Sequence, residues 1–117
     1  MILTGKCKED FQMWYFNKFC NSGKKYHELL PHHMHDVFGW FYGIDSSFKW
    51  GVFLKFFDSV GINIEIGIGF KRGTMKVISY YCYYEGVRNE APFKTRTKAQ
   101  KAAIDSANEI YNKRSST

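Results

Sequence analysis

The chain has 117 residues, of which 44% are hydrophobic and 19% aromatic, and its net charge is +6. This length supports one hydrophobic core, so we expect a single domain over residues 1–117, and the hydrophobic content excludes general disorder. The charge is uneven, because residues 1–60 hold seven cations and six acids whereas residues 61–117 hold ten cations and five acids. A basic second half indicates nucleic acid, a nucleoprotein or an acidic protein surface as partner.

The cysteines and the hydropathy of the chain predict its cellular compartment. Cys7, Cys20 and Cys82 show neither disulfide nor zinc spacing, which is typical of reduced thiols in a cytosolic setting. The first residues lack the long apolar core of a signal peptide, and no apolar run approaches the roughly 18 residues that span a membrane. We therefore expect a cytoplasmic protein.

The first third of the chain predicts one helix and an ambiguous segment. Apolar residues recur at helical spacing over residues 8–20, and Asn21-Ser22-Gly23 favours the end of that helix. Residues 24–44 contain Pro31, and the apolar segment 37–42 fits either a short strand or a wall of the core. The apolar face of the helix consists of Phe11, Trp14, Tyr15 and Phe19.

A second helix is expected over residues 48–60. Asp45-Ser46-Ser47 supplies capping side chains before it, and Gly61 fits its C-terminal stop. The alternation of Trp50, Val52 and Leu54 leaves a strand open as the alternative.

Two strands and a tight turn follow. Residues 62–70 alternate between apolar residues and polar residues or glycine, which predicts a strand with one buried face and one polar or bare face. Lys71-Arg72-Gly73 predicts the turn, and residues 74–84 return as a strand that is apolar or aromatic on both faces. Such a strand is central or carries an exposed aromatic face. Residues 87–93 fit a short edge strand.

The last helix is expected over residues 98–113, with residues 114–117 frayed. Thr97 followed by Gln100 matches a capping box and places the first helical residue at Lys98. Small alanines on one face allow this helix to lie close to a sheet. The expected fold is thus α+β, with an antiparallel β-hairpin or three-stranded sheet packed by N-terminal, middle and C-terminal helices.

Four cations surround the expected start of the last helix. A helix N-terminus carries partial positive charge and favours acidic side chains, so cations there cost stability unless an anion approaches. Tyrosines of the second strand offer stacking surfaces for exposed bases. The residues predicted to bind nucleic acid or a partner are Lys71, Arg72, Arg88, Lys94, Arg96, Lys98, Lys101, Tyr80, Tyr83 and Tyr84.

Catalysis and metal binding have little support in the sequence. His27, His32, His33 and His35 lie within nine residues, but they lack a metal-ligand spacing such as His-Glu-x-x-His. There is no nucleophile elbow and no phosphate-binding glycine-rich loop. We therefore expect no enzyme, no cofactor and no metal site, and a metal-dependent enzyme built on the histidines is the second alternative to a binding function.

The order helix, strand, strand, short strand, helix over residues 48–113 resembles that of double-stranded RNA-binding domains. Those domains also place lysines at the start of their last helix to hold phosphates. Lys98 and Lys101 are three residues apart, without the usual Lys-Lys-x-Ala-Lys run, and the turn at Lys71–Gly73 lacks the usual minor-groove loop.

Two segments, Trp50–Ile62 and Phe93–Asn112, resemble small phage and prophage proteins of the Bacteroidetes, which have no known activity. The resemblance implies an accessory phage protein in the cytoplasm of an infected bacterium. It further implies inhibition of a host-defence system, in the manner of anti-CRISPR proteins that bind an effector with its guide RNA. A stand-alone RNA- or DNA-binding protein that uses the same basic surface is the first alternative.

Overall fold

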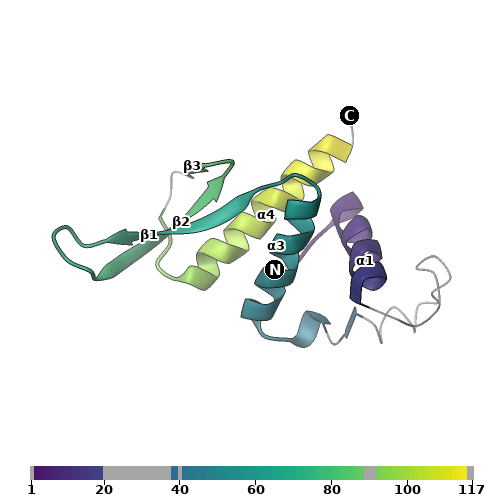
Figure 1. Cartoon of the computed structure of the whole chain (residues 1–117), viewed down its shortest axis with the longest axis horizontal. Helices are drawn as coiled ribbons and strands as arrows, with labels where there is room; N and C mark the ends of the chain where they lie inside the picture. Colours follow the sequence, from purple (N-terminus) through teal and green to yellow (C-terminus); the bar gives the residue numbers. More distant parts are fainter. Residues whose placement is uncertain (1, 20–37, 40, 89–91, 116–117) are drawn as a thin grey trace.

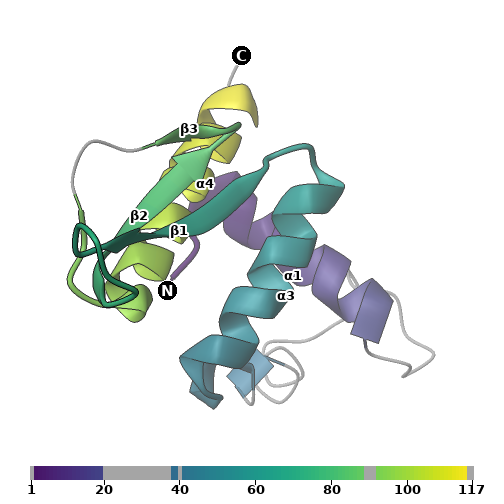
Figure 2. The same cartoon turned by 60° about the vertical axis from the view of Figure 1, so that its left-hand side comes forward.

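The computed structural model describes residues 2–19, 38–39, 41–88 and 92–115. The described strands form an antiparallel sheet in the order β1-β2-β3, and α4 runs along one face of it with α1 and α3 beside α4 (Figures 1 and 2). The expected α+β class, with a three-stranded sheet packed by helices, is confirmed. No described helix has the length and apolar character needed to cross a membrane. The elements are α1 (Gly5–Phe19), α3 (Ser46–Ser59), β1 (Ile64–Phe70), β2 (Val77–Tyr84), β3 (Val87–Arg88) and α4 (Arg96–Ser115).

The first half of the chain follows its hydrophobic pattern. α1 begins three residues before the expected residue 8, whereas its expected stop at Asn21–Gly23 lies outside the described residues. Residues 38–39 and 41–43 are helical, and Phe38 and Phe41 are buried. The segment 37–42 is therefore a wall of the core where it is described, and the strand interpretation is wrong.

α3 confirms the expected middle helix and excludes the strand alternative there. Asp45 is its N-cap, and the Asp45 carboxylate accepts a hydrogen bond from the backbone N–H of Ser47 at 2.8 Å. The helix ends at Ser59, and Gly61 follows with a φ of 78°, a left-handed conformation that glycine adopts at little cost.

Phenylalanine builds most of the core. The ring of Phe11 in α1 lies within 6.0 Å of five other aromatic rings, centroid to centroid. Seven of the eleven phenylalanines are buried, so the aromatic content largely serves packing. The five neighbours of Phe11 are Trp14, Tyr15, Phe41, Phe53 and Phe56.

Two asparagines of α4 hold the start of α1. The Asn108 side chain accepts from the backbone N–H of Thr4 and donates to its hydroxyl, both at 2.9 Å. The Asn112 side chain accepts from the backbone N–H of Cys7 at 2.8 Å and donates to the Thr4 carbonyl at 3.0 Å. Because the first N–H groups of a helix have no intrahelical acceptor, α4 supplies the cap that the N-terminal segment lacks.

The sheet differs from expectation at its outer end. Ile62 and Ile64 are buried as predicted, but Ile68 and Phe70 are each 43% exposed, so the expectation of one continuously buried face is wrong. α4 begins beside Tyr80, the register partner of Ile68, and the hairpin extends beyond it (Figure 1). The outer half of the hairpin therefore has no described helix to pack on. We call residues 68–78 the hairpin arm.

The other strand boundaries are shorter than predicted. β2 begins at Val77 rather than at residue 74, and a β-bulge interrupts its pairing with β1 near Phe70. β3 is described at Val87 and Arg88, and Phe93 joins the sheet through an isolated bridge to Tyr80; the part of the expected edge strand between them, residues 89–91, lies outside the described residues. The central position predicted for the second strand is confirmed. α4 extends through Ser115, two residues past the expected end at residue 113, and residues 116 and 117 lie outside the described residues.

A tyrosine–carboxylate contact joins the same two helices. The Tyr111 hydroxyl of α4 donates a hydrogen bond to the carboxylate of Asp10 in α1, which also pairs with Lys6 at 2.8 Å. Burial, with the Asp10 contact, raises the pKa of Tyr111 to about 12. Burial by itself would raise the pKa of Asp10, but the contacts with Lys6 and Tyr111 hold that pKa below its ordinary value.

This contact predicts a loss of stability in alkaline solution. The unfolded chain releases the tyrosine proton at pH of about 10, so the stabilisation is complete below that pH and is lost as pH rises toward the folded pKa of about 12. An absorbance titration of tyrosinate should show a late component that Tyr111→Phe reduces. A late component of unchanged size in Tyr111→Phe would contradict this assignment.

Candidate anion-binding site at the start of helix α4

The start of α4 lies two residues before the expected position. The hydroxyl of Thr95 accepts a hydrogen bond from the backbone N–H of Lys98 at 3.2 Å, so Thr95 caps the helix and Arg96 is its first residue. The capping box predicted for Thr97 and Gln100 is therefore wrong. This start places Arg96 and Lys98 in the first turn of α4, the end of the helix that carries partial positive charge.

The segment before α4 is fixed to the sheet. Phe93 exchanges two backbone hydrogen bonds of 2.8 Å with Tyr80 of β2. The Arg96 guanidinium lies over the Tyr80 ring, 5.6 Å from its centroid. A guanidinium held on an aromatic face keeps its N–H edges available to an acceptor. Tyr80 therefore positions Arg96, and is half-buried in doing so.

The neighbouring lysines differ in their partners. Lys101 pairs with Asp105 at 2.9 Å, so its charge is partly neutralised. Lys94 and Lys98 are exposed and form no ion pair or side-chain hydrogen bond with any other residue that the structure describes. The first turn of α4 contains no acidic residue. The helix start therefore presents uncompensated positive charge to solvent. We call Lys94, Arg96 and Lys98 the α4 anion site.

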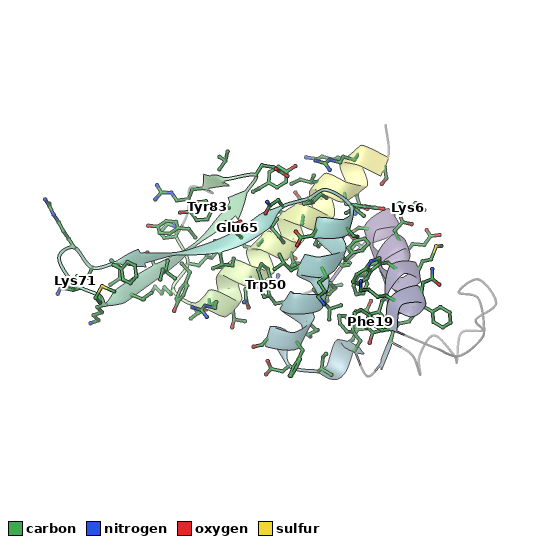
Figure 3. The ribbon with its side chains drawn as sticks, in the orientation of Figure 1. Lys6, Phe19, Trp50, Glu65, Lys71 and Tyr83 are labelled. Carbon is green, nitrogen blue, oxygen red and sulfur yellow. The ribbon has the colours of Figure 1, made fainter. Side chains whose placement is uncertain are left out.

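The hairpin turn carries a second basic group. The Lys71 N–H donates to the Lys76 carbonyl at 2.8 Å, and the Thr74 hydroxyl donates to the Lys71 carbonyl at 2.9 Å. These bonds order the tip, where Gly73 adopts a φ of 76°. Lys71, Arg72 and Lys76 are exposed, and Lys71 lies at the far end of the arm (Figure 3). This tip is therefore a preorganised cationic end.

Two predicted residues lie on the other face of the sheet. Cys82 faces α4, where its thiol donates to the Ala99 carbonyl at 2.9 Å, so the side chains of residues 81 and 83 point away from α4. The Tyr83 ring covers Gly67, where an added Cβ would come within 2.4 Å of the ring. The Arg88 guanidinium lies 4.6 Å from the centroid of the Tyr81 ring on that same face.

The ten predicted residues therefore do not form one surface. Tyr84 accepts a hydrogen bond of 2.9 Å from Arg114, near the C-terminal end of α4 and away from the anion site. Lys76 at the hairpin tip and Tyr81 beside Arg88 were not predicted as site residues. The length of the turn, which places Lys76, and the contact of Tyr81 with Arg88 are visible only in the folded sheet. The structure groups Tyr80, Lys94, Arg96, Lys98 and Lys101 at the start of α4, Lys71 and Arg72 at the hairpin tip, and Arg88, Tyr83 and Tyr84 elsewhere.

The described cysteines are poor candidates for nucleophiles. Cys7 is fully buried, and burial raises the pKa of its thiol to about 12. Burial likewise raises the pKa of Cys82. Both therefore remain protonated near neutral pH. The four histidines lie outside the described residues, and within the described ranges no cluster of three or more potential metal ligands occurs.

No family model matches the chain, and no curated protein or solved structure is significantly similar to it, so its function is inferred from the geometry of the site.

Proposed function

We propose that this protein is a non-catalytic, phage-encoded inhibitor that binds RNA phosphates within a bacterial defence nucleoprotein, such as a CRISPR effector with its guide RNA. The observation that carries the proposal is the pair of exposed lysines, Lys94 and Lys98, at the positive end of α4 without a described counter-charge. Backbone N–H groups and cations at a helix start together suit a phosphate oxygen.

The element order supports RNA as the anion. The order α3, β1, β2, β3, α4, with α4 on one face of the antiparallel sheet, is the order that double-stranded RNA-binding domains have. In those domains the start of the last helix holds phosphates. Lys94, Arg96 and Lys98 would take that role here. The phage context rests on the resemblance of residues 50–62 and 93–112.

The hairpin arm favours a nucleoprotein over free nucleic acid. Met75 and Ile78 are 86% and 57% exposed, and they lie on the same arm as the cationic tip. Contact with phosphates would leave these apolar side chains exposed to water, whereas contact with a protein surface would bury them. A target that offers both phosphates and apolar protein surface matches both features.

Capture experiments test the proposal. Immobilised protein should retain a guide-loaded CRISPR effector from the natural host more strongly than the same effector without guide RNA, and retention should fall with salt because phosphate contacts release counterions. A gel shift with a free RNA duplex over a salt series measures the stand-alone alternative. Tight binding to free RNA without retention of any loaded effector would favour that alternative. Binding to neither would overturn the proposed function.

A further inference from the structure

The outer edge of β1 exposes unpaired backbone groups. β1 is an edge strand in the order β1-β2-β3. Ile68 faces Tyr80 in the register, but Tyr80 exchanges both of its backbone hydrogen bonds with Phe93 on its other side. Ile68 and Tyr80 are therefore a non-hydrogen-bonded pair, and the N–H and C=O of Ile68 point away from β2. No described segment pairs with this edge.

β1 lacks the proline and lysine that usually prevent strand addition, and the extra residue of the β-bulge, Ile78, lies on β2. β1 has the sequence Ile-Glu-Ile-Gly-Ile-Gly-Phe, without proline or lysine. Edge strands of soluble proteins commonly carry such residues, or are covered, because an unpaired flat strand recruits another strand. Two of its apolar side chains, Ile68 and Phe70, are 43% exposed.

We propose that β1 pairs antiparallel with β1 of a second copy of this chain, about a two-fold axis at Ile68, to form a continuous six-stranded sheet. The strand is self-complementary in this register. Ile68 would exchange backbone hydrogen bonds with the second Ile68, and Ile66 would lie beside the exposed Phe70. On the opposite face Glu65 would lie beside Lys71 of the other copy.

Charge complementarity selects a second copy as the occupant. Glu65 is exposed at one end of β1, and Lys71 is exposed just beyond the other end (Figure 3). A two-fold axis between them places Glu65 of each copy beside Lys71 of the other copy. The interface then contains two equivalent acid–cation pairs, as an isologous interface requires. An unrelated strand would have to reproduce this spacing. The pairing does not depend on the proposed function. It would carry the two hairpin tips to opposite ends of the assembly.

Sedimentation of the full chain tests the pairing. We expect a monomer–dimer equilibrium over roughly 1 µM to 1 mM, the range in which modest interfaces titrate. Ile68→Pro removes an N–H that points outward, so it should weaken dimerisation at least about tenfold while keeping the hydrogen bonds between β1 and β2. A monomer over the whole range would overturn the proposal.

A charge swap keeps the proposal testable if the proline variant does not fold. Glu65→Lys or Lys71→Glu alone should weaken the dimer, and the double variant should restore it, because the two charges meet across the axis. Lys76→Glu is the matched control, since it makes the same charge change on the arm but on the β2 side of the hairpin, away from the proposed axis. A dimer that both single variants leave unchanged would contradict the proposed register.

Discussion

Lys98→Glu is expected to weaken binding at least about tenfold while leaving the protein as stable as before or slightly more stable. In binding, the change replaces a contact to a phosphate with a repulsion, and charge-assisted contacts are worth about 1.5–3 kcal/mol each. In folding, an acid in the first turn of α4 suits the helix dipole, which favours it by about 0.3–1 kcal/mol. Opposite signs in the two measurements distinguish a binding residue from a structural one.

Both quantities can be measured on the same purified variant. Capture of the guide-loaded effector and the RNA gel shift report affinity, and we expect the salt slope to fall by about one with each lost phosphate contact. Adding Arg96→Glu should reduce affinity further. It also removes the contact with Tyr80, worth about 0.5–1 kcal/mol, which offsets the gain from an acid in the first turn, so we expect no net increase in stability from that second change.

Lys8→Glu is the control for net charge. Lys8 is exposed on α1, near the end of α4 that holds Asn112, about 20 Å from the anion site by the helical rise. The variant should retain most of the affinity. Equal loss in Lys8→Glu and Lys98→Glu would show that only overall charge matters, and full affinity in Lys98→Glu would remove the basis for the anion site.

Phe11→Ala is expected to cost about 3–5 kcal/mol in the free energy of unfolding, the range for truncating a buried aromatic side chain. Phe11 is fully buried and contacts rings from α1, from α3 and from the segment at residue 41. Small domains have only about 5–15 kcal/mol in total, so the variant should lose most of its stability. The midpoint of urea unfolding measures the change.

Phe48→Ala gives the matched comparison, because Phe48 is the same residue type but 70% exposed. Its cost should be within about 0.5 kcal/mol, the usual range for surface substitutions. If the two variants shifted the urea midpoint equally, Phe11 would not have the central role in packing that its five ring contacts indicate.

The error at the start of α4 shows why local patterns have limits. Thr97 and Gln100 form the better capping-box sequence, yet Thr95 caps the helix although Lys98 stands three residues after it. The bridge between Phe93 and Tyr80 ends the extended segment and brings the chain to α4 two residues earlier. A pairing between residues 13 positions apart cannot be read from the four residues around the cap.

The arm shows the same limit for burial. The alternation over residues 62–70 correctly predicts which side chains share a face, because successive side chains of a strand point to opposite sides. It does not predict that Ile64 is buried and Phe70 exposed. That difference depends on where α4 begins beneath the sheet.

The sequence by itself indicated the first and last helices, the two long strands, the α+β class and the concentration of positive charge in the second half. These follow from periodicity and composition, which act over a few residues. Only the tertiary structure decided which cations meet at the start of α4, which of them Asp105 neutralises, and that β1 lies at an edge of the sheet. Those properties depend on contacts between distant segments. Of the four cations around the start of the last helix, three form the anion site, Lys94, Arg96 and Lys98, and the fourth, Lys101, pairs with Asp105.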